Sequence, residues 1–231
     1  SIKLKNLDEK NKTFLKKLFL ILLRRNDIEH SDLLFNAKLF LFSERNKNRI
    51  ENLINLNISL LDKEEIKTFL KEELLLLMLQ KSVVADQFLE KILTKLRLEI
   101  LFAFVESNIK LSKKYYNFVI SISAQCFLNE YVFSQSSKEN KFVKKLLILM
   151  EKRKKIDELG VAILGCYMPI VFSKNIKKKL LRYKTKNILF NDLISMQIKE
   201  PLQEKELLNS IQSFGKISDL ISKKVRKQYE E

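Results

Sequence analysis

The chain contains very few of the residues that interrupt helices. Among its 231 residues there are three glycines and two prolines, and its apolar residues recur mostly at helical spacing. Sandwiches and barrels need turn-forming residues at almost every connection. No 34-residue repeat with small and aromatic positions in register is visible. The sequence therefore predicts an all-α fold, an irregular stack of helix pairs with no sheet.

Helix caps and apolar periods locate the individual helices. Helices are expected over residues 7–25, from Ser31, over 46–61, 72–80 and 86–105, after Ser112, over 142–155, from Pro201 and from Ser218. Residues 72–80 are apolar nearly all round, which is typical of a central helix. Pro169 is expected to end or kink any helix that reaches it.

A polar, Ser-rich segment at residues 134–140 is the clearest linker in the chain. The charge balance changes at the same place. Residues 1–136 carry 22 basic and 17 acidic side chains, whereas residues 137–231 carry 22 and 11. The segment either divides two helical subdomains, 1–136 and a basic 137–231, or connects two helices of one continuous domain.

Composition and cysteine usage indicate a globular protein of a reducing compartment. Hydrophobic residues make up 46% of the chain. Cys126 and Cys166 both lie in apolar runs, where a free thiol behaves as a small hydrophobe, and a disulfide framework or a zinc site needs more cysteines at closer spacing. No apolar run approaches the roughly 18 residues of a spanning helix, and no signal-peptide pattern opens the chain. We expect a soluble, cytoplasmic protein that binds no metal or cofactor through this chain.

Side chains suited to catalysis are scarce. His30 is the only histidine, so a metal site or a His-based triad is hard to build, and we expect it to be a surface or cap residue. The glutamate pairs at 64–65 and 72–73 lie at helix starts or on solvated faces. Gly160 and Gly165 lack the preceding strand and the further glycines of a nucleotide-binding turn. We assign no catalytic residue to this chain.

The segment QCFLNEYVF, which starts at Gln125, places polar side chains in an apolar stretch. At 100° per residue, Gln125 and Asn129 fall on one helix face. In a structural interpretation, these two amides bond the ends of neighbouring helices and Glu130 pairs with an arginine such as Arg97, because an unsatisfied buried polar group costs about 1–3 kcal/mol. In a functional interpretation, a cleft for a ligand or partner is formed by Gln125, Asn129, Glu130 and Tyr131. Both interpretations stay open.

QCFLNEYVF, together with VRKQYEE at residues 225–231, resembles a segment of bacterial methyltransferase-like proteins. In those proteins a helical, often tetratricopeptide-bearing, N-terminal region precedes a class I S-adenosylmethionine-dependent methyltransferase domain. The two matches cover 16 of 231 residues. The resemblance implies that this chain is a non-catalytic domain that recognises a substrate or partner protein through the cleft near Gln125, and that the catalytic domain is absent from it.

The stretch SKNIKKKLLRYKTK, residues 173–186, is the strongest signal for an interaction surface. It contains no acid, and its cations are Lys174, Lys177, Lys178, Lys179, Arg182, Lys184 and Lys186. The net charge of +16 attracts polyanions. The alternative function is therefore nucleic-acid binding. A solvated face in a chain whose Lys-rich composition reflects a genome biased toward A and T explains the same pattern.

The geometry expected for this basic stretch is that of a helix. Lys178 and Arg182 would align at i, i+4, and Leu180 and Leu181 could turn toward the core. The cations of residues 151–155 and 223–227 would extend the stretch into a ridge that follows phosphates. Only Tyr183 interleaves with the cations, although single-strand binders usually present several aromatic rings.

Overall fold

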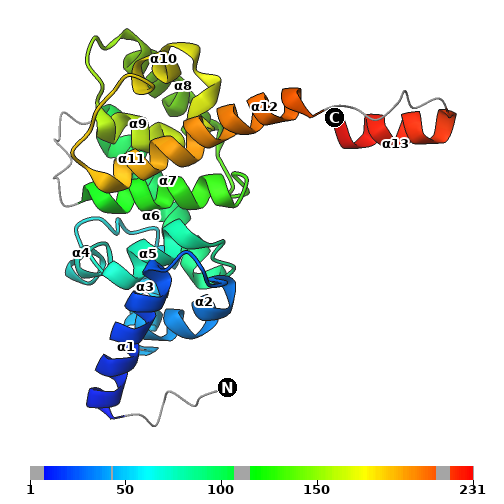
Figure 1. Cartoon of the computed structure of the whole chain (residues 1–231). Coiled ribbons are helices and arrows are strands. Elements are labelled where there is room, and N and C mark those ends of the chain that lie inside the picture. Colours follow the sequence, from blue (N-terminus) through cyan, green and yellow to red (C-terminus); the bar gives the residue numbers. More distant parts are fainter. Residues whose placement is uncertain (1–7, 43, 107–114, 212–218, 231) are drawn as a thin grey trace.

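The computed structural model describes residues 8–42, 44–106, 115–211 and 219–230 (Figure 1). Within these ranges every regular element is a helix and no strand occurs, which confirms the all-α prediction. The α-helices are α1 (Glu9–Arg24), α2 (Ser31–Ala37), α3 (Glu44–Asn55), α4 (Glu64–Phe69), α5 (Glu73–Lys81), α6 (Gln87–Glu106), α7 (Tyr116–Leu128), α8 (Ser137–Lys152), α9 (Glu158–Gly165), α10 (Lys174–Leu180), α11 (Ile188–Ile194), α12 (Glu200–Ser210) and α13 (Leu220–Glu230). In the described residues there are also the 3₁₀ turns η2 (Lys38–Phe40) and η4 (Ile170–Phe172) and the π-helix η5 (Ser195–Lys199).

Helix α7 forms the centre of the molecule. Every residue from Phe118 to Cys126 is buried, on all sides of the helix. A helix without a charged residue and without a polar face must be enclosed. Helix α5 packs on one side of α7, and α9 and α11 pack on it from the other (Figure 1). Helix α5 itself lies between α1 and α7, as its all-round apolar sequence predicts.

Glycine allows α9 to approach its neighbours closely. A Cβ on Gly165 would lie 2.3 Å from Oγ of Ser123 on α7 and 3.0 Å from the side chain of Ile170. A Cβ on Gly160 would lie 2.4 Å from Sδ of Met150 on α8. Two of the chain's three glycines therefore serve helix packing, since real side chains do not approach this closely.

Pro201 lies in the first turn of α12, as expected, and α12 continues directly from the π-helix η5. Helix α11, η5 and α12 follow one another without a break from residue 188 to residue 210. If the α-helix ran unbroken through this point, the ring of Pro201 would clash with the carbonyl of Gln197. That carbonyl would also receive no hydrogen bond, because proline has no N–H. The N–H of Glu200 donates to the carbonyl of Ser195, five residues back. This wider π turn accommodates the proline and buries the Gln197 side chain.

The expected helices are found, with several different bounds. The helix expected over 46–61 ends at Asn55, and Asn57 follows with a left-handed φ of 52°. Pro169 follows α9 and directly precedes η4, as expected. Ser112 and Ser218, predicted as N-caps, lie outside the described residues. No helix in the described ranges is both long and apolar enough to cross a membrane.

One cluster of buried side chains extends across residues 134–140. It includes Ile50 of α3, Phe118 of α7 and Ile198 of η5. A second, smaller cluster joins α1, α2 and α5 around Leu23. Residues on both sides of the 136/137 boundary therefore contribute to the same core.

Candidate functional site

The segment QCFLNEYVF contains the C-terminus of α7. The helix ends at Leu128, and Glu130 and Tyr131 follow with left-handed φ values of 55° and 61°. The N–H of Tyr131 donates to the carbonyl of Cys126 at 2.8 Å, and the N–H of Glu130 donates to the carbonyl of Phe127 at 3.1 Å. These are the two hydrogen bonds of a Schellman motif, whose left-handed position is most often glycine. The segment thus terminates the central helix, with Glu130 where glycine is usual.

Gln125, Asn129 and Glu130 lie in different environments. Gln125 is buried, and its Oε1 accepts the N–H of Val84, just before α6, at 3.1 Å. Asn129 is partly buried as the C-cap residue of α7, and Glu130 is exposed. The contact of Gln125 agrees with the structural interpretation for that residue.

Tyr131 faces a buried glutamine. Its O–H donates to Oε1 of Gln197 at 3.4 Å, and the same oxygen accepts the N–H of Ile170 at 3.2 Å. Nε2 of Gln197 donates to the carbonyl and to Oγ of Ser123, at 3.2 and 3.3 Å. Gln197 therefore ties α7, η4 and η5 together, and Tyr131 belongs to this interior network.

The predicted pair between Glu130 and Arg97 is wrong, because Glu139 takes that place. Arg97 on α6 is buried, with Nη2 3.6 Å from Oε1 of Glu139. Nη2 also donates to the carbonyl of Ser134 at 2.7 Å, and Nη1 donates to that of Cys166 at 3.3 Å. After the Schellman turn, the chain runs back toward α6, so the carboxylate that reaches Arg97 comes from the next helix.

Residues 134–140 make ordered contacts. Ser136 caps α8 in a capping box: its Oγ accepts the N–H of Glu139 at 3.2 Å, and its own N–H donates to Oε2 of Glu139 at 2.7 Å. The O–H of Tyr167 donates to Oε1 of the same carboxylate at 3.3 Å, and the Arg97 guanidinium lies 4.4 Å from the Tyr167 ring centre. This polar segment thus supplies the anion of a buried ionic cluster.

The two cysteines are buried side by side between α7 and α9. Sγ of Cys166 donates to the carbonyl of Ala162 at 3.3 Å. Burial raises the pKa of the Cys166 thiol well above its usual range. In the described ranges, no group of three or more His, Cys, Asp or Glu side chains is arranged to hold a metal ion.

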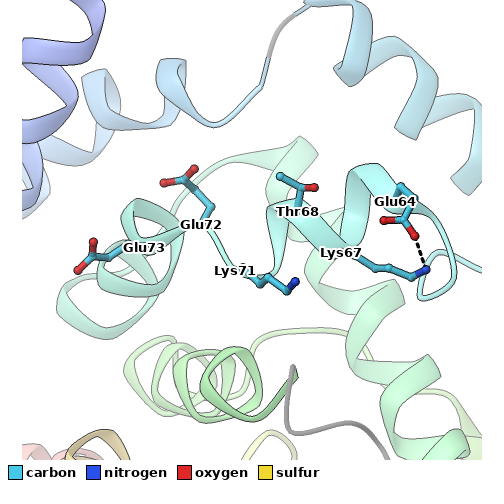
Figure 2. A pocket seen from close by; sticks show the side chains of 6 residues that line it. All are labelled: Glu64, Lys67, Thr68, Lys71, Glu72 and Glu73. Atoms are coloured by element: carbon cyan, nitrogen blue, oxygen red, sulfur yellow. Dashed lines mark hydrogen bonds and ion pairs between the residues drawn. The ribbon is translucent and has the colours of Figure 1, made fainter.

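A pocket of ≈ 490 Å³ lies along α4 and the start of α5 (Figure 2). It is lined by Glu64, Lys67, Thr68, Lys71, Glu72 and Glu73. Figure 2 shows the 2.6 Å ion pair of Glu64 with Lys67 at one end of the pocket and Glu72 and Glu73 at the other. Glu72 pairs with Lys16 at 2.8 Å, and Glu73 pairs with Arg24. These carboxylates stand at helix starts, as the sequence predicts for them, and the structure adds the ion pairs.

The basic stretch folds into a short helix and a loop. Helix α10 ends at Leu180, so the expected i, i+4 alignment of Lys178 with Arg182 was wrong. Leu180 is buried, as expected, whereas Leu181 is exposed and does not turn toward the core. The outward face of α10 carries Lys174 and Lys178, opposite the buried Ile176 and Leu180. Of the remaining predicted cations, Arg182, Lys184 and Lys186 are exposed in the following loop, and Lys177 and Lys179 are partly buried.

The loop between α8 and α9 adjoins this helix. Nζ of Lys179 donates to the carbonyls of Glu151 and Arg153, at 2.9 and 2.8 Å. The cations of residues 151–155 therefore join those of α10, as expected. Those of residues 223–227 belong to α13, which lies beyond α12 and away from α10 in Figure 1. We call residues 151–159 and 172–188 together the basic surface.

A pocket of ≈ 720 Å³ lies at the α8–α9 loop within the basic surface. It is lined by Tyr116, Arg153, Lys154, Lys155, Ile156, Asp157, Glu158 and Leu159. Glu158 accepts the O–H groups of Tyr116 and Tyr183, the latter at 2.8 Å. Burial raises the pKa of both phenols, so at neutral pH each stays protonated and able to donate.

Each of the three acids within residues 141–186 already has a partner in the structure. Residues 141–186 contain fourteen basic and three acidic side chains. Glu151 accepts the hydroxyl of Ser173 at 2.8 Å, and Asp157 caps α9 and pairs with Arg153. The third, Glu158, holds the two tyrosines. In the described part of the chain, no ion pair engages Lys154, Lys155, Lys174, Lys178, Arg182, Lys184 or Lys186.

Sequence reasoning missed one residue of this surface. Phe172, which immediately precedes the cap of α10, is 72% exposed. Phe172 ends the apolar stretch GVAILGCYMPIVF, a context that predicts a core residue. The turn η4 directs its ring outward instead.

Comparisons with protein-family models, with curated proteins and with solved structures find no match for this chain.

Proposed function

We propose that this protein binds nucleic acid through the basic surface. The observation that carries the proposal is that, of the three acids within residues 141–186, only Asp157 pairs with a cation of the basic surface, Arg153, so in the described part of the chain the other exposed cations of this surface have no ion-pair partner. Cations that release condensed counterions from phosphates supply most of the affinity of non-specific nucleic-acid binding. A merely solvated face would more often mix charges of both signs.

The fold supports this use of the surface. Lys174 and Lys178 project from one face of α10 because Ile176 and Leu180 hold the opposite face in the core. Lys179 connects α10 to the loop at residues 151–155. Cations from two parts of the chain are therefore held in fixed positions relative to one another. Such preorganisation lowers the ordering cost of binding.

The test is fluorescence anisotropy of labelled RNA and DNA with the full chain at several salt concentrations. The triple variant Lys178→Gln, Lys184→Gln, Lys186→Gln should weaken binding and flatten the salt dependence, by roughly 0.7–0.9 in log–log slope for each phosphate that the variant no longer neutralises. The matched control is Lys10→Gln, Lys17→Gln, Lys91→Gln, which removes the same charge from exposed positions on α1 and α6. Absence of binding at 50 mM salt, or equally weakened binding in both triples, would overturn the proposal.

A second candidate is the recognition domain of a larger methyltransferase-like protein, which the resemblance implies. The observation that favours it is the uncovered apolar surface of the last helices. The exposed residues are Leu207, Leu208, Ile211, Ile221 and Val225. A further domain of the same polypeptide would cover such side chains. The intact mass of the endogenous protein tests this: a mass much above 27.4 kDa supports a following domain, and a mass near that value removes it.

A further inference from the structure

The aromatic ring that the sequence places among the cations is turned inward. Tyr183 is partly buried, with its hydroxyl on Glu158 and its ring 6.4 Å from that of Phe190 in an edge-on arrangement. It therefore offers little open ring face to a ligand. The exposed aromatic ring of the basic surface is that of Phe172.

Phe172 is held on a fixed turn between anchored neighbours. Its N–H donates to the carbonyl of Pro169 at 3.2 Å. Ile170, two residues earlier, is buried, and its N–H bonds to Gln197. Ser173, the next residue, caps α10 through Ile176 and donates to Glu151. The backbone that carries this ring is therefore ordered before any ligand binds.

Phe172 directly precedes Ser173, the N-cap of α10, whose outward face is cationic. Lys174 follows Phe172 by two residues, and Lys178 lies one helical turn further, on the same face as Lys174. Leu181, directly after α10, and Ile188 are further exposed apolar residues of the basic surface. An exposed ring beside a row of cations is the combination by which proteins stack single-stranded bases while holding their phosphates. In a duplex, the bases are stacked on one another and offer no free face to such a ring.

We propose that the basic surface prefers single-stranded nucleic acid and that Phe172 is the residue on which a base stacks. This inference rests on the proposed nucleic-acid function and adds the strand type and the contact residue. It predicts that affinity depends on the aromatic ring for single strands and not for duplexes.

The first experiment compares variants at Phe172 by fluorescence anisotropy with a labelled single strand and with its duplex at 50 mM salt. Phe172→Leu keeps an apolar side chain and removes the ring, so single-strand affinity should fall about fivefold or more, with duplex affinity unchanged. Phe172→Tyr should stay within about twofold of the parent, because the ring remains. Equal single-strand affinity of the Leu variant and the parent would overturn the stacking role, while the lysine triple still reports on nucleic-acid binding.

The second experiment uses the absence of tryptophan from the chain. Phe172→Trp introduces a single indole fluorophore at the proposed contact, and stacking of a base on it should quench its emission. The matched control, Phe14→Trp, places the indole on α1, where Phe14 is 66% exposed, and its emission should not change. Unchanged emission of the Phe172→Trp protein at saturating single strand would refute the contact.

A third arm addresses the apolar neighbours of Phe172. Anionic vesicles of phosphatidylserine and phosphatidylcholine are added to the Phe172→Trp protein, since exposed Phe172, Leu181 and Ile188 among cations could also meet a lipid surface. A blue shift with vesicles, combined with no binding of any single strand, would assign the surface to lipid and overturn both proposals. Binding of the single strand without such a shift supports them.

Discussion

The guanidinium of Arg97 and the carboxylate of Glu139 lie 3.6 Å apart, with 1% and 6% of their side chains exposed. They come from α6 and α8 and meet against the ring of Tyr167. Each has further hydrogen bonds, because Arg97 donates to two carbonyls and Glu139 accepts the N–H of Ser136. A buried ion pair of this kind is costly to break by removing one partner, because the other charge is left without compensation.

Replacement of one partner should therefore destabilise the protein strongly. Arg97→Met or Glu139→Gln should each reduce the free energy of unfolding by about 3–5 kcal/mol, measured by urea denaturation followed by circular dichroism. The double variant should lose less than the sum of the two single variants. Additive losses would show that the two charges do not act as a pair.

The two packed glycines should differ in their response to alanine. Gly165→Ala places a Cβ against Ser123, whose Oγ also bonds to Gln197, and should cost about 1–3 kcal/mol in unfolding free energy. Gly160→Ala meets the flexible end of Met150, and the gain of up to about 1 kcal/mol from alanine's helix propensity offsets that contact. Thermal unfolding of the two variants compares them. A larger loss of stability for Gly160→Ala would contradict this packing.

Glu130 offers a site for stabilisation. Its φ of 55° is strained for a residue with a Cβ and natural for glycine. Glu130→Gly should raise the free energy of unfolding by about 0.5–1 kcal/mol despite the greater freedom of glycine in the unfolded chain. Glu130→Gln, which keeps the Cβ, serves as the control and should leave the melting temperature unchanged because the side chain is exposed. A loss of stability in the glycine variant would mean that the carboxylate has a partner.

The buried tyrosines should make the fold sensitive to alkali. Burial raises the pKa of Tyr167 above the value of about 10 that it has in the unfolded chain. Above that pH, the unfolded state binds fewer protons than the folded state, so stability falls as pH rises. Tyr167→Phe removes this contribution. Between about pH 9 and pH 11, the melting temperature of the variant should therefore fall less than that of the parent. Parallel melting curves for the two proteins would exclude the effect.

The sequence predicted most helices correctly, because helix caps and apolar spacing depend only on residues close together in the chain. The all-apolar sequence of residues 72–80 predicts an interior helix, and α5 is one. The cations from Lys174 onward predicted an exposed surface, and most are exposed. The end of α7 was missed because no glycine or proline marks it, and the Schellman turn places Glu130 where a local pattern would expect glycine. The π turn before Pro201 gave no sequence signal either, since proline at that position suits a helix start equally well.

The sequence by itself determined that this chain is helical, that its central helices are apolar, and that its positive charge gathers around residues 151–186. These are properties of spacing and composition along the chain. Only the tertiary structure decided which partners meet. It pairs Arg97 with Glu139 and leaves Glu130 in solvent, and it turns Tyr183 inward and Phe172 outward. The physical reason is that side-chain partners are chosen by how helices distant in sequence pack together, and hydrophobic burial drives that packing without regard to the distance along the chain.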